Sequence, residues 1–399
     1  MVSQAAPKMN RSNSCFDVVV IGGGINGAGV AQAVAAAGYS VALLEKSSIA
    51  AGTSSKSSKL IHGGLRYLEN FDFKLVRESL KERELLLQLA PTLVKRIPFF
   101  IPLYQHSSRS ALKVTAGLML YRLLAGFHRR TGFRVVHRHE WEQLDDLKLD
   151  GLKKIFQYWD AQTDDVALTG AVMRSAQQLG AELHAPAEFL CAESLDHGYR
   201  ISYREAGATR QMQATIAVNA AGPWAETVAQ RFKPVLPVIA TQNVQGAHIE
   251  IDMQLSRRAY YLEAPADRRA VFVIPWMGRT LIGTTETLYT GDPDDVHPLE
   301  SEIDYLKSVF GHYFGNSDIE IRAAWAGLRV LPAADTSAFT RTRESSIVAD
   351  DQQQPHALTI FGGKITSYRV TAGKVLQLCK QTLEKRSGIA DTARLKLDA

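Results

Sequence analysis

The order of apolar and polar positions predicts a parallel-sheet unit at the start of the chain. Residues 16–21 form a continuous apolar run, and residues 39–45 form a second run that ends on an acid. Short runs of this kind are typical of strands buried on both faces. Residues 30–38 between them are rich in alanine, which favours a helix, and end on glycine. The pattern therefore predicts a strand, a glycine-rich turn, a helix and a second strand.

Later segments alternate between apolar and polar residues, which favours antiparallel strands, and one later segment has helical spacing instead. Residues 300–315 place Ile303, Leu306, Val309 and Phe310 on one helical face, so we expect a helix there. Met277 and Gly278 have the spacing of a two-residue hairpin turn. Residues 357–378 read as a strand, a Gly-Gly pair and a helix. The remaining predicted strands are 186–192, 198–204, 209–213, 247–251, 259–263, 270–276 and 279–286, and residues 214–225 read as a strand running into small residues.

Composition narrows the class of protein. The 399 residues are 46% apolar, enough for an ordinary core, and no run is long enough to cross a membrane. Residues 1–15 lack the apolar segment of a secretion signal, so we expect a disordered leader. Cys15, Cys191 and Cys379 are too far apart for a zinc motif, so we expect reduced thiols, no metal and a cytoplasmic location.

The positive charge is uneven. The net charge is +5, and residues 85–139 contain no Asp or Glu. Such a block indicates an anionic partner (a membrane surface, nucleic acid or a phosphorylated ligand) or only a solvated basic face. We see no motif for reading nucleic-acid bases and expect no nucleic acid as partner. The basic residues of the block are Lys95, Arg96, Arg109, Lys113, Arg122, Arg129, Arg130, Arg134 and Arg138.

The glycine-rich turn is typical of a dinucleotide site. Gly22, Gly24 and Gly27 have the G-x-G-x-x-G spacing: the first permits the tight turn, the second lets the backbone approach a pyrophosphate, and the third lets helix and strand pack closely. The helix N-terminus faces the phosphates. Glu45 ends the second strand, where a carboxylate can accept hydrogen bonds from a ribose and would repel a 2′-phosphate.

Two further segments favour FAD over NAD. Residues 53–69, TSSKSSKLIHGGLRYLE, leave the sheet as a long polar loop that can run along an extended cofactor. Gly362 and Gly363 precede a late helix whose N-terminus can stabilise negative charge on a flavin ring. A plain strand-to-helix turn is the alternative for this second feature. Residues 214–225 offer small residues where a cofactor can pass close to backbone.

The chain resembles the FAD-dependent glycerol-3-phosphate dehydrogenase family, within the D-amino-acid oxidase-like flavoproteins. The motifs DVVVIGGGINGAG, TSSKSSKLIHGGLRYLE, VNAAGPW, VFVIPW, IGTTE and FGGKITSYR carry the resemblance, which spans about residues 16–378. It implies an α/β fold with a Rossmann-like FAD domain (16–90, 155–225 and 345–385). This domain is interleaved with an antiparallel-sheet substrate or cap domain (91–154 and 226–344). Residues 386–399 are expected as a tail without the family's C-terminal helical domain.

The resemblance implies a reaction. The family oxidises the secondary alcohol of sn-glycerol 3-phosphate to dihydroxyacetone phosphate, with hydride transfer to FAD and electrons passed on to a quinone. A base is needed, and imidazole titrates near neutral pH, so His62 is our first candidate and His248 the second. For the phosphate we expect Arg66, Arg329, Arg341 and Lys364, because arginine forks fit phosphate oxygens. Arg343 is the alternative to Arg341.

Two departures from the family pattern bear on substrate. Gln245 stands where the family commonly has a lysine, which removes one cation, and the chain stops at Ala399. Residues expected to contact non-covalent FAD are Gly22, Gly24, Gly27, Glu45, Thr53, Ser54, Ser55, Gly63, Gly64, Ala221, Gly222, Gly362, Gly363, Lys364 and Thr366. Ser367 is a further cofactor or helix-capping candidate.

Several alternatives stay open. Segment 109–130 is basic and apolar, so it can lie on the cytoplasmic face of an inner membrane, or it is a core helix of the substrate domain. The chain can also be an FAD-dependent oxidase or dehydrogenase of another small 2-hydroxy acid or amine. A flavin-binding subunit without catalysis is the third interpretation.

Overall fold

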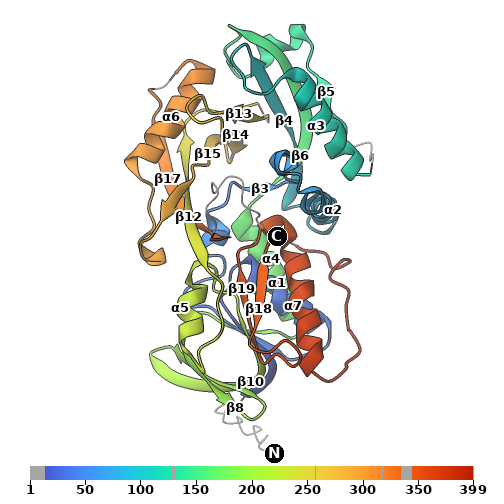
Figure 1. The fold of residues 1–399 in the computed structure, drawn as a ribbon, viewed down its shortest axis with the longest axis vertical. Coiled ribbons are helices and arrows are strands. Elements are labelled where there is room, and N and C mark those ends of the chain that lie inside the picture. The colour runs from blue at the N-terminus through green and yellow to red at the C-terminus, as the bar shows by residue number, and fades with distance from the viewer. Residues whose placement is uncertain (1–13, 127–130, 257, 317, 334–343, 399) are drawn as a thin grey trace, which may run out of the picture.

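Two β-sheets, one above the other along the long axis of the molecule, make up the fold (Figure 1). The computed structural model describes residues 14–126, 131–256, 258–316, 318–333 and 344–398. Strands and helices follow one another in a mixed order, so the predicted α/β class is confirmed.

The first sheet is built around the predicted opening unit. Its central strands run parallel in the order β7, β2, β1, β10 and β19, and the other members pair antiparallel except for the short β11. The strands are β1 (Ser14–Ile21), β2 (Val41–Leu44), β7 (Glu182–His184), β8 (Ala187–Leu195), β9 (Gly198–Glu205), β10 (Ala208–Asn219), β11 (Phe232–Lys233), β18 (Ser346–Ala349) and β19 (Ala357–Phe361).

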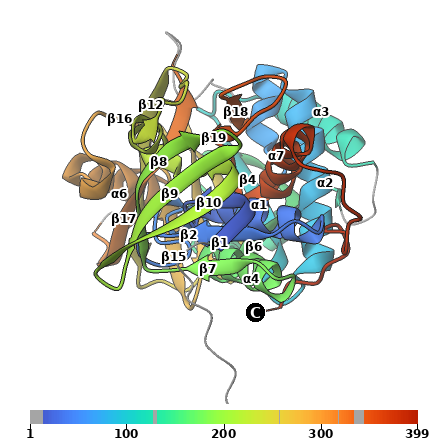
Figure 2. The same ribbon diagram turned by 90° about the horizontal axis from the view of Figure 1, so that it is seen from below.

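Both faces of β1 are buried, as its continuous apolar run predicts. Val18 and Val20 pack into a core formed with the helices, whereas Val19 and Ile21 face a second core under β8 and β9. Successive side chains of a strand point to opposite faces, so both faces must be apolar. Figure 2 shows α1 and α7 on one side of the paired strands β1 and β10, and the long strands β8 and β9 on the other. The helices are α1 (Ile25–Ala36), α4 (Asp165–Gln178), α5 (Ala225–Gln230) and α7 (Tyr368–Thr382).

The second sheet is mainly antiparallel, as the alternating segments predict. The Met277-Gly278 turn joins β14 and β15 with positive φ at both residues, 47° and 79°. The strands are β3 (Leu60–Ile61), β4 (Val94–Tyr104), β5 (Arg134–Val135), β6 (Leu152–Thr163), β12 (Thr241–Ile251), β13 (Ala259–Glu263), β14 (Ala270–Trp276), β15 (Arg279–Gly283), β16 (Thr287–Tyr289) and β17 (Ile321–Pro332); the helices are α2 (Phe73–Leu89), α3 (Ala111–Leu124) and α6 (Glu300–Phe314).

Sheet membership differs from the expected segment boundaries in three places. Residues 155–163 belong to β6, which pairs with β4 in the second sheet. Lys233 lies in β11, which extends the first sheet through β8. Ser14 and Cys15 already pair with β10 as part of β1. At the other end, the backbone N–H of Leu397 donates to Leu89, so residues 386–398 pack back on the helices.

Several members of the basic block form ion pairs with acids that flank the block or lie elsewhere in the chain. Arg96 pairs with Glu84, Arg109 with Glu69 and Glu263, and Arg134 with Glu140. Arg129 and Arg130 lie outside the described residues. Within the described ranges, no helix combines the length and apolar character that a membrane crossing requires.

Candidate active site

One cavity of about 710 Å³ receives segments from both ends of the chain. His62 and Lys364 both line it, as do the glycine turn after β1 and the Gly-Gly pair after β19. The serine-rich loop and the late glycine turn therefore share one cavity.

The glycine turn forms the cradle at one end. Gly22 has φ +108°, and a Cβ there would lie 2.7 Å from the carbonyl oxygen of Ala220. A Cβ on Gly27 would lie 1.9 Å from the carbonyl oxygen of Gly22, so only glycine fits where α1 packs against the turn. The hydroxyl of Ser54 accepts from the backbone N–H of Ile25 at 2.9 Å and thereby satisfies one of the free N–H groups at the start of α1.

Glu45 and Trp224 line the cavity close to the glycine turn. The Glu45 carboxylate lines the cavity and accepts from the backbone N–H of Gly23 at 2.7 Å. Lys46 lies with its Nζ 4.2 Å from the centre of the Trp224 ring and pairs with Asp294 at 2.6 Å. This ion pair joins the two sheet regions at the cavity rim.

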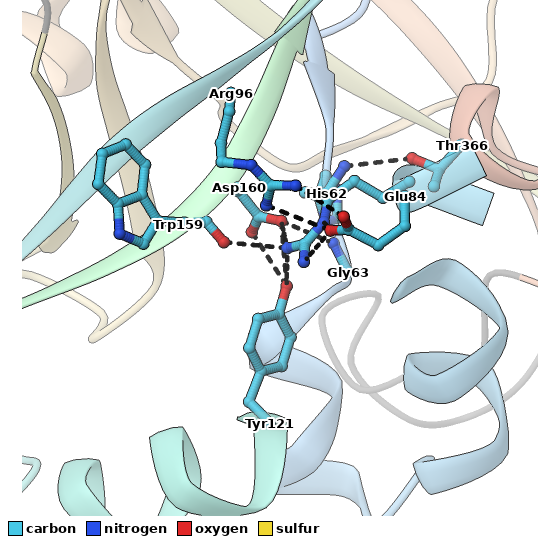
Figure 3. Close-up of polar contacts among 9 residues, drawn as sticks. His62, Gly63, Glu84, Arg96, Tyr121, Trp159, Asp160 and Thr366 are labelled. Carbon is cyan, nitrogen blue, oxygen red and sulfur yellow. Dashed lines mark hydrogen bonds and ion pairs between the residues drawn. The ribbon is translucent and has the colours of Figure 1, made fainter. Parts of the chain in front are cut away.

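A hydrogen bond joins the start of α1 to the late glycine turn. The Asn26 Nδ2 donates to the carbonyl of Gly362 at 3.1 Å, and its buried Oδ1 has no partner among the described residues. Gly362 and Gly363 have φ of +71° and +107°. The Thr366 hydroxyl accepts from the backbone N–H of His62 at 3.3 Å (Figure 3). An unpartnered buried acceptor beside glycine backbone fits an extended polar ligand.

Tyr67 lies among the candidate catalytic and phosphate-binding groups. Its buried ring is 6.3 Å from the His62 ring, 4.6 Å from the Lys364 Nζ and 5.0 Å from the Arg66 guanidinium carbon. Lys364 also donates to Ser79 at 3.2 Å. Sequence reasoning passed over Tyr67, although it stands within the HGGLRYLE motif that carried the resemblance.

His248 lines the same cavity and is buried. Its Nε2 is 2.9 Å from the Ser58 hydroxyl, and its ring stacks on Trp325 with 5.8 Å between centres. Burial, reinforced by the positive charges of Arg329 and Lys59, lowers the pKa of His248 to about 3. His248 is therefore neutral at physiological pH.

The arginines are held by a buried carboxylate. Arg329 lines the cavity, and its two terminal nitrogens donate to Glu286 at 2.9 Å and to the Thr285 carbonyl at 2.6 Å. Arg66 lies 3.8 Å from the same Glu286 carboxylate. Arg341 and Arg343 lie outside the described residues.

Gln245 does not face the cavity. It is buried on β12 and donates to the Glu302 carboxylate on α6 at 2.6 Å and to the His297 carbonyl at 3.0 Å. Contrary to expectation, glutamine in place of lysine at this position therefore does not deprive the substrate of a cation. The position lies on the other face of the strand from His248, three residues away.

Most of the expected cofactor residues line the cavity, and some do not. The Ser55 hydroxyl donates back to Gly52 at 3.0 Å, and Gly64 supplies a left-handed turn with φ +76°. Gly27, Ser55, Gly63, Gly64 and Arg66 are absent from the lining, whereas Gly22, Gly24, Glu45, Thr53, Ser54, Ala221, Gly222, Gly362, Gly363, Lys364 and Thr366 belong to it. Lining residues that sequence reasoning missed are Asn26, Ser57, Ser58, Tyr67, Trp224 and Thr284.

Known proteins are similar to this chain in sequence and in fold. The family model for FAD dependent oxidoreductases matches residues 17–369. A glycerol-3-phosphate dehydrogenase of Synechocystis is 35% identical over 90% of this chain and 68% of its own length. A D-erythritol 1-phosphate dehydrogenase of Brucella abortus is 36% identical over 93% of this chain and 75% of its own length.

A solved structure is also similar. The glycerol-3-phosphate dehydrogenase of Bacillus halodurans, complexed with FAD, superposes with a TM-score of 0.75 at 25% identity over 96% of this chain and 67% of that one. The cavity fits FAD, since it combines the glycine cradle, a carboxylate and a second glycine turn. The chain belongs to the FAD-dependent oxidoreductase family, in the group of FAD-dependent glycerol-3-phosphate dehydrogenases, and its cofactor is FAD.

Proposed function

We propose that this enzyme oxidises sn-glycerol 3-phosphate to dihydroxyacetone phosphate. The observation that carries the proposal is the arrangement of His62, Tyr67 and Lys364, which brings an imidazole and a cation to one wall of the FAD cavity. The names of the relatives support a polyol phosphate as substrate.

Lys364 and Arg329 are the proposed phosphate ligands, because they are cations that line the cavity. Arg66 supports this site from behind the Tyr67 ring. Burial acts to lower the pKa of Arg66, but Tyr67 and Glu286 outweigh it and raise the pKa, so the guanidinium stays charged. A phosphate dianion in a partly buried site gains most from such fixed charges.

His62 is the proposed base for the C2 hydroxyl. It lines the cavity in a half-buried position, and its backbone is fixed by Thr366. His248, with a pKa of about 3, is a weak base at neutral pH, so we assign it the orientation of the substrate hydroxyl through hydrogen bonding. Bound FAD supplies the hydride acceptor.

Anaerobic addition of glycerol 3-phosphate to the purified holoenzyme tests the proposal. We expect bleaching of the flavin absorbance, little bleaching with glycerol, and a KM raised at least tenfold in Lys364→Met with a smaller effect on kcat. Bleaching only by erythritol 1-phosphate, a 2-hydroxy acid or an amine would overturn the substrate assignment. Absence of bleaching with every substrate would favour a non-catalytic flavin protein.

Electron transfer to a quinone and docking on an anionic membrane are the second part of the proposal. Exposed apolar side chains of α3 and of residues 71–73, called here the patch, support it, because apolar side chains near a basic residue favour a lipid interface. The basic residue is Lys113 on α3, whose side chain is 64% exposed although it pairs with Glu69 at 3.3 Å. This location would place the protein on the cytoplasmic face of an inner membrane. The patch consists of Phe71 (76% exposed), Phe73 (40%), Leu112 (80%), Met119 (59%) and Leu123 (53%).

Vesicle flotation tests the docking surface. We expect the holoenzyme to float with vesicles that contain anionic lipid and to remain in solution with neutral ones. Leu112→Glu should abolish flotation, whereas Ile389→Glu, a matched change at another exposed apolar residue, should not. Equal flotation of both variants would remove the patch from the proposal. Reduction of a soluble quinone faster than oxygen would support the acceptor.

A further inference from the structure

A buried ion pair lies directly behind the loop that carries His62. Arg83 and Asp160 are joined by an Nη1–Oδ1 contact of 2.6 Å (Figure 3). The Asp160 carboxylate also accepts from the backbone N–H of Gly63 at 3.0 Å and from the Tyr121 hydroxyl at 3.1 Å. Gly63 immediately follows His62, so the carboxylate is hydrogen-bonded to the loop of the proposed base.

Burying two charged groups costs free energy, and both Arg83 and Asp160 make several hydrogen bonds that offset this cost. Arg83 has no exposed surface and Asp160 retains only 2%. Burial raises the pKa of Asp160, although the Arg83 charge opposes this shift. Arg83 donates further to the Trp159 carbonyl at 2.9 Å and to Glu84 at 2.9 Å. A buried charged network of this kind is a poor source of stability, which favours a role in specifying geometry.

Four segments meet at Gly63. Arg83 comes from α2, Tyr121 from α3 and Asp160 from β6, and these are far apart in sequence. A Cβ on Gly63 would lie 2.3 Å from the Tyr121 hydroxyl and 2.5 Å from Leu80, so the loop fits closely against the network. On the other side, Thr366 accepts from the backbone N–H of His62. Two successive backbone N–H groups are therefore held from opposite sides.

Helix α2 also contacts Lys364, one of the residues proposed to bind the substrate phosphate. Ser79, one turn before Arg83 on α2, accepts from the Lys364 ammonium at 3.2 Å. Residues four apart lie on the same face of a helix. One helix face thus contacts both the His62 loop, through Asp160, and Lys364.

We propose that Asp160 is a positioning residue for His62, with Tyr121 and Arg83 fixing the carboxylate against the Gly63 N–H. The inference rests on the proposed function, in which His62 acts as the base. Asp160 holds the backbone of the loop, and through it the imidazole, at the cavity wall where the substrate hydroxyl binds. The network orders the loop before substrate arrives, which lowers the cost of reaching a productive geometry.

Tyr121→Phe is the mildest test, because it removes one hydrogen bond to Asp160 and keeps the ring. The matched control is Tyr260→Phe, which removes a 2.7 Å hydrogen bond from a buried tyrosine to Asp145 in the core under α6. We expect Tyr121→Phe to slow anaerobic flavin reduction by about threefold to tenfold, the effect of one ordinary hydrogen bond. Tyr260→Phe should leave the rate unchanged.

Hydrogen–deuterium exchange of the holoenzyme gives a readout that does not need turnover. Peptides covering residues 60–66 should exchange faster in Tyr121→Phe and in Asp160→Asn than in wild type or Tyr260→Phe. Thermal unfolding of each variant separates lost stability from lost positioning. If Asp160→Asn fails to fold, the exchange and flavin-reduction rates of Tyr121→Phe alone decide whether the network positions the His62 loop.

Two results would overturn the inference. One is unchanged exchange of residues 60–66 in Tyr121→Phe. The other is faster exchange together with a wild-type rate of flavin reduction. If wild type is not reduced by glycerol 3-phosphate, the proposed function fails, while the exchange data still decide whether the network holds the loop.

Discussion

The side chain of Asn26 donates to the backbone carbonyl of Gly362 at 3.1 Å, across 336 positions of sequence. Asn26 lies in the first turn of α1 and Gly362 directly follows β19. The hydrogen bond closes the FAD cavity where the first and last parts of the sheet meet. A Cβ on Gly363 would lie 3.0 Å from the same amide, so the fit is tight.

We predict that Asn26→Asp weakens FAD binding by about tenfold or more, because a carboxylate there opposes the Gly362 carbonyl oxygen without donating to it. Fluorescence titration of the apoprotein with FAD measures the affinity. The control is Asn316→Asp, the same change in an exposed loop. Equal affinities for the two variants would show that the Asn26 hydrogen bond contributes little.

Gln245→Lys should leave both KM and kcat within about twofold of wild type. The new ammonium would pair with Glu302 under α6, on the face of β12 away from the cavity. Lys364→Gln, the opposite exchange at a residue that lines the cavity, should raise KM for glycerol 3-phosphate strongly. A substrate preference changed by Gln245→Lys would contradict the outward placement of this side chain.

His248 should make the protein less stable in acid. Its folded pKa, about 3, lies below the ordinary 6.5, so the folded state binds fewer protons than the unfolded state between these values. The free energy of unfolding is unaffected by this group above pH 6.5 and falls as the pH decreases toward 3. Urea unfolding at several pH values should show a shallower fall in His248→Asn, while His197→Asn, in an exposed turn, should follow wild type.

Two glycine substitutions within helices should act in opposite directions. Gly27→Ala places a methyl group 1.9 Å from the Gly22 carbonyl oxygen and should cost at least about 1–3 kcal/mol of unfolding free energy. Gly117→Ala meets open space on α3 and should gain about 0.5–1 kcal/mol from helix propensity. Thermal unfolding of both variants, with and without FAD, checks the signs. A neutral Gly27→Ala would mean that helix and strand can separate.

Much of the fold follows from local pattern. The glycine turn, the buried strand β1 and the hairpin at Met277-Gly278 were predictable because their conformations depend on neighbouring residues. The boundary at residue 155 was not, because β6 belongs to the second sheet through its pairing with β4, which is distant in sequence.

The candidate site was predictable only in part. His62 and Lys364 were found through motifs, whereas Asp160 gave no local signal, because its partner Arg83 lies 77 positions away. The direction of Gln245 could be read only from its strand register. Side chains alternate between the two faces of a strand, so Gln245 and His248 point to different faces of β12 once the strand Thr241–Ile251 is known.

The interleaved order of the first sheet has a consequence for biosynthesis. Strand β19 pairs with β10 at the centre of the sheet, although it is made more than a hundred residues later. The nascent polypeptide therefore cannot complete the FAD cavity until β19 and the glycine pair that follows it have left the ribosome. Truncation before Ala357 should yield a product that retains no flavin, since neither lobe of the molecule is a contiguous stretch of chain.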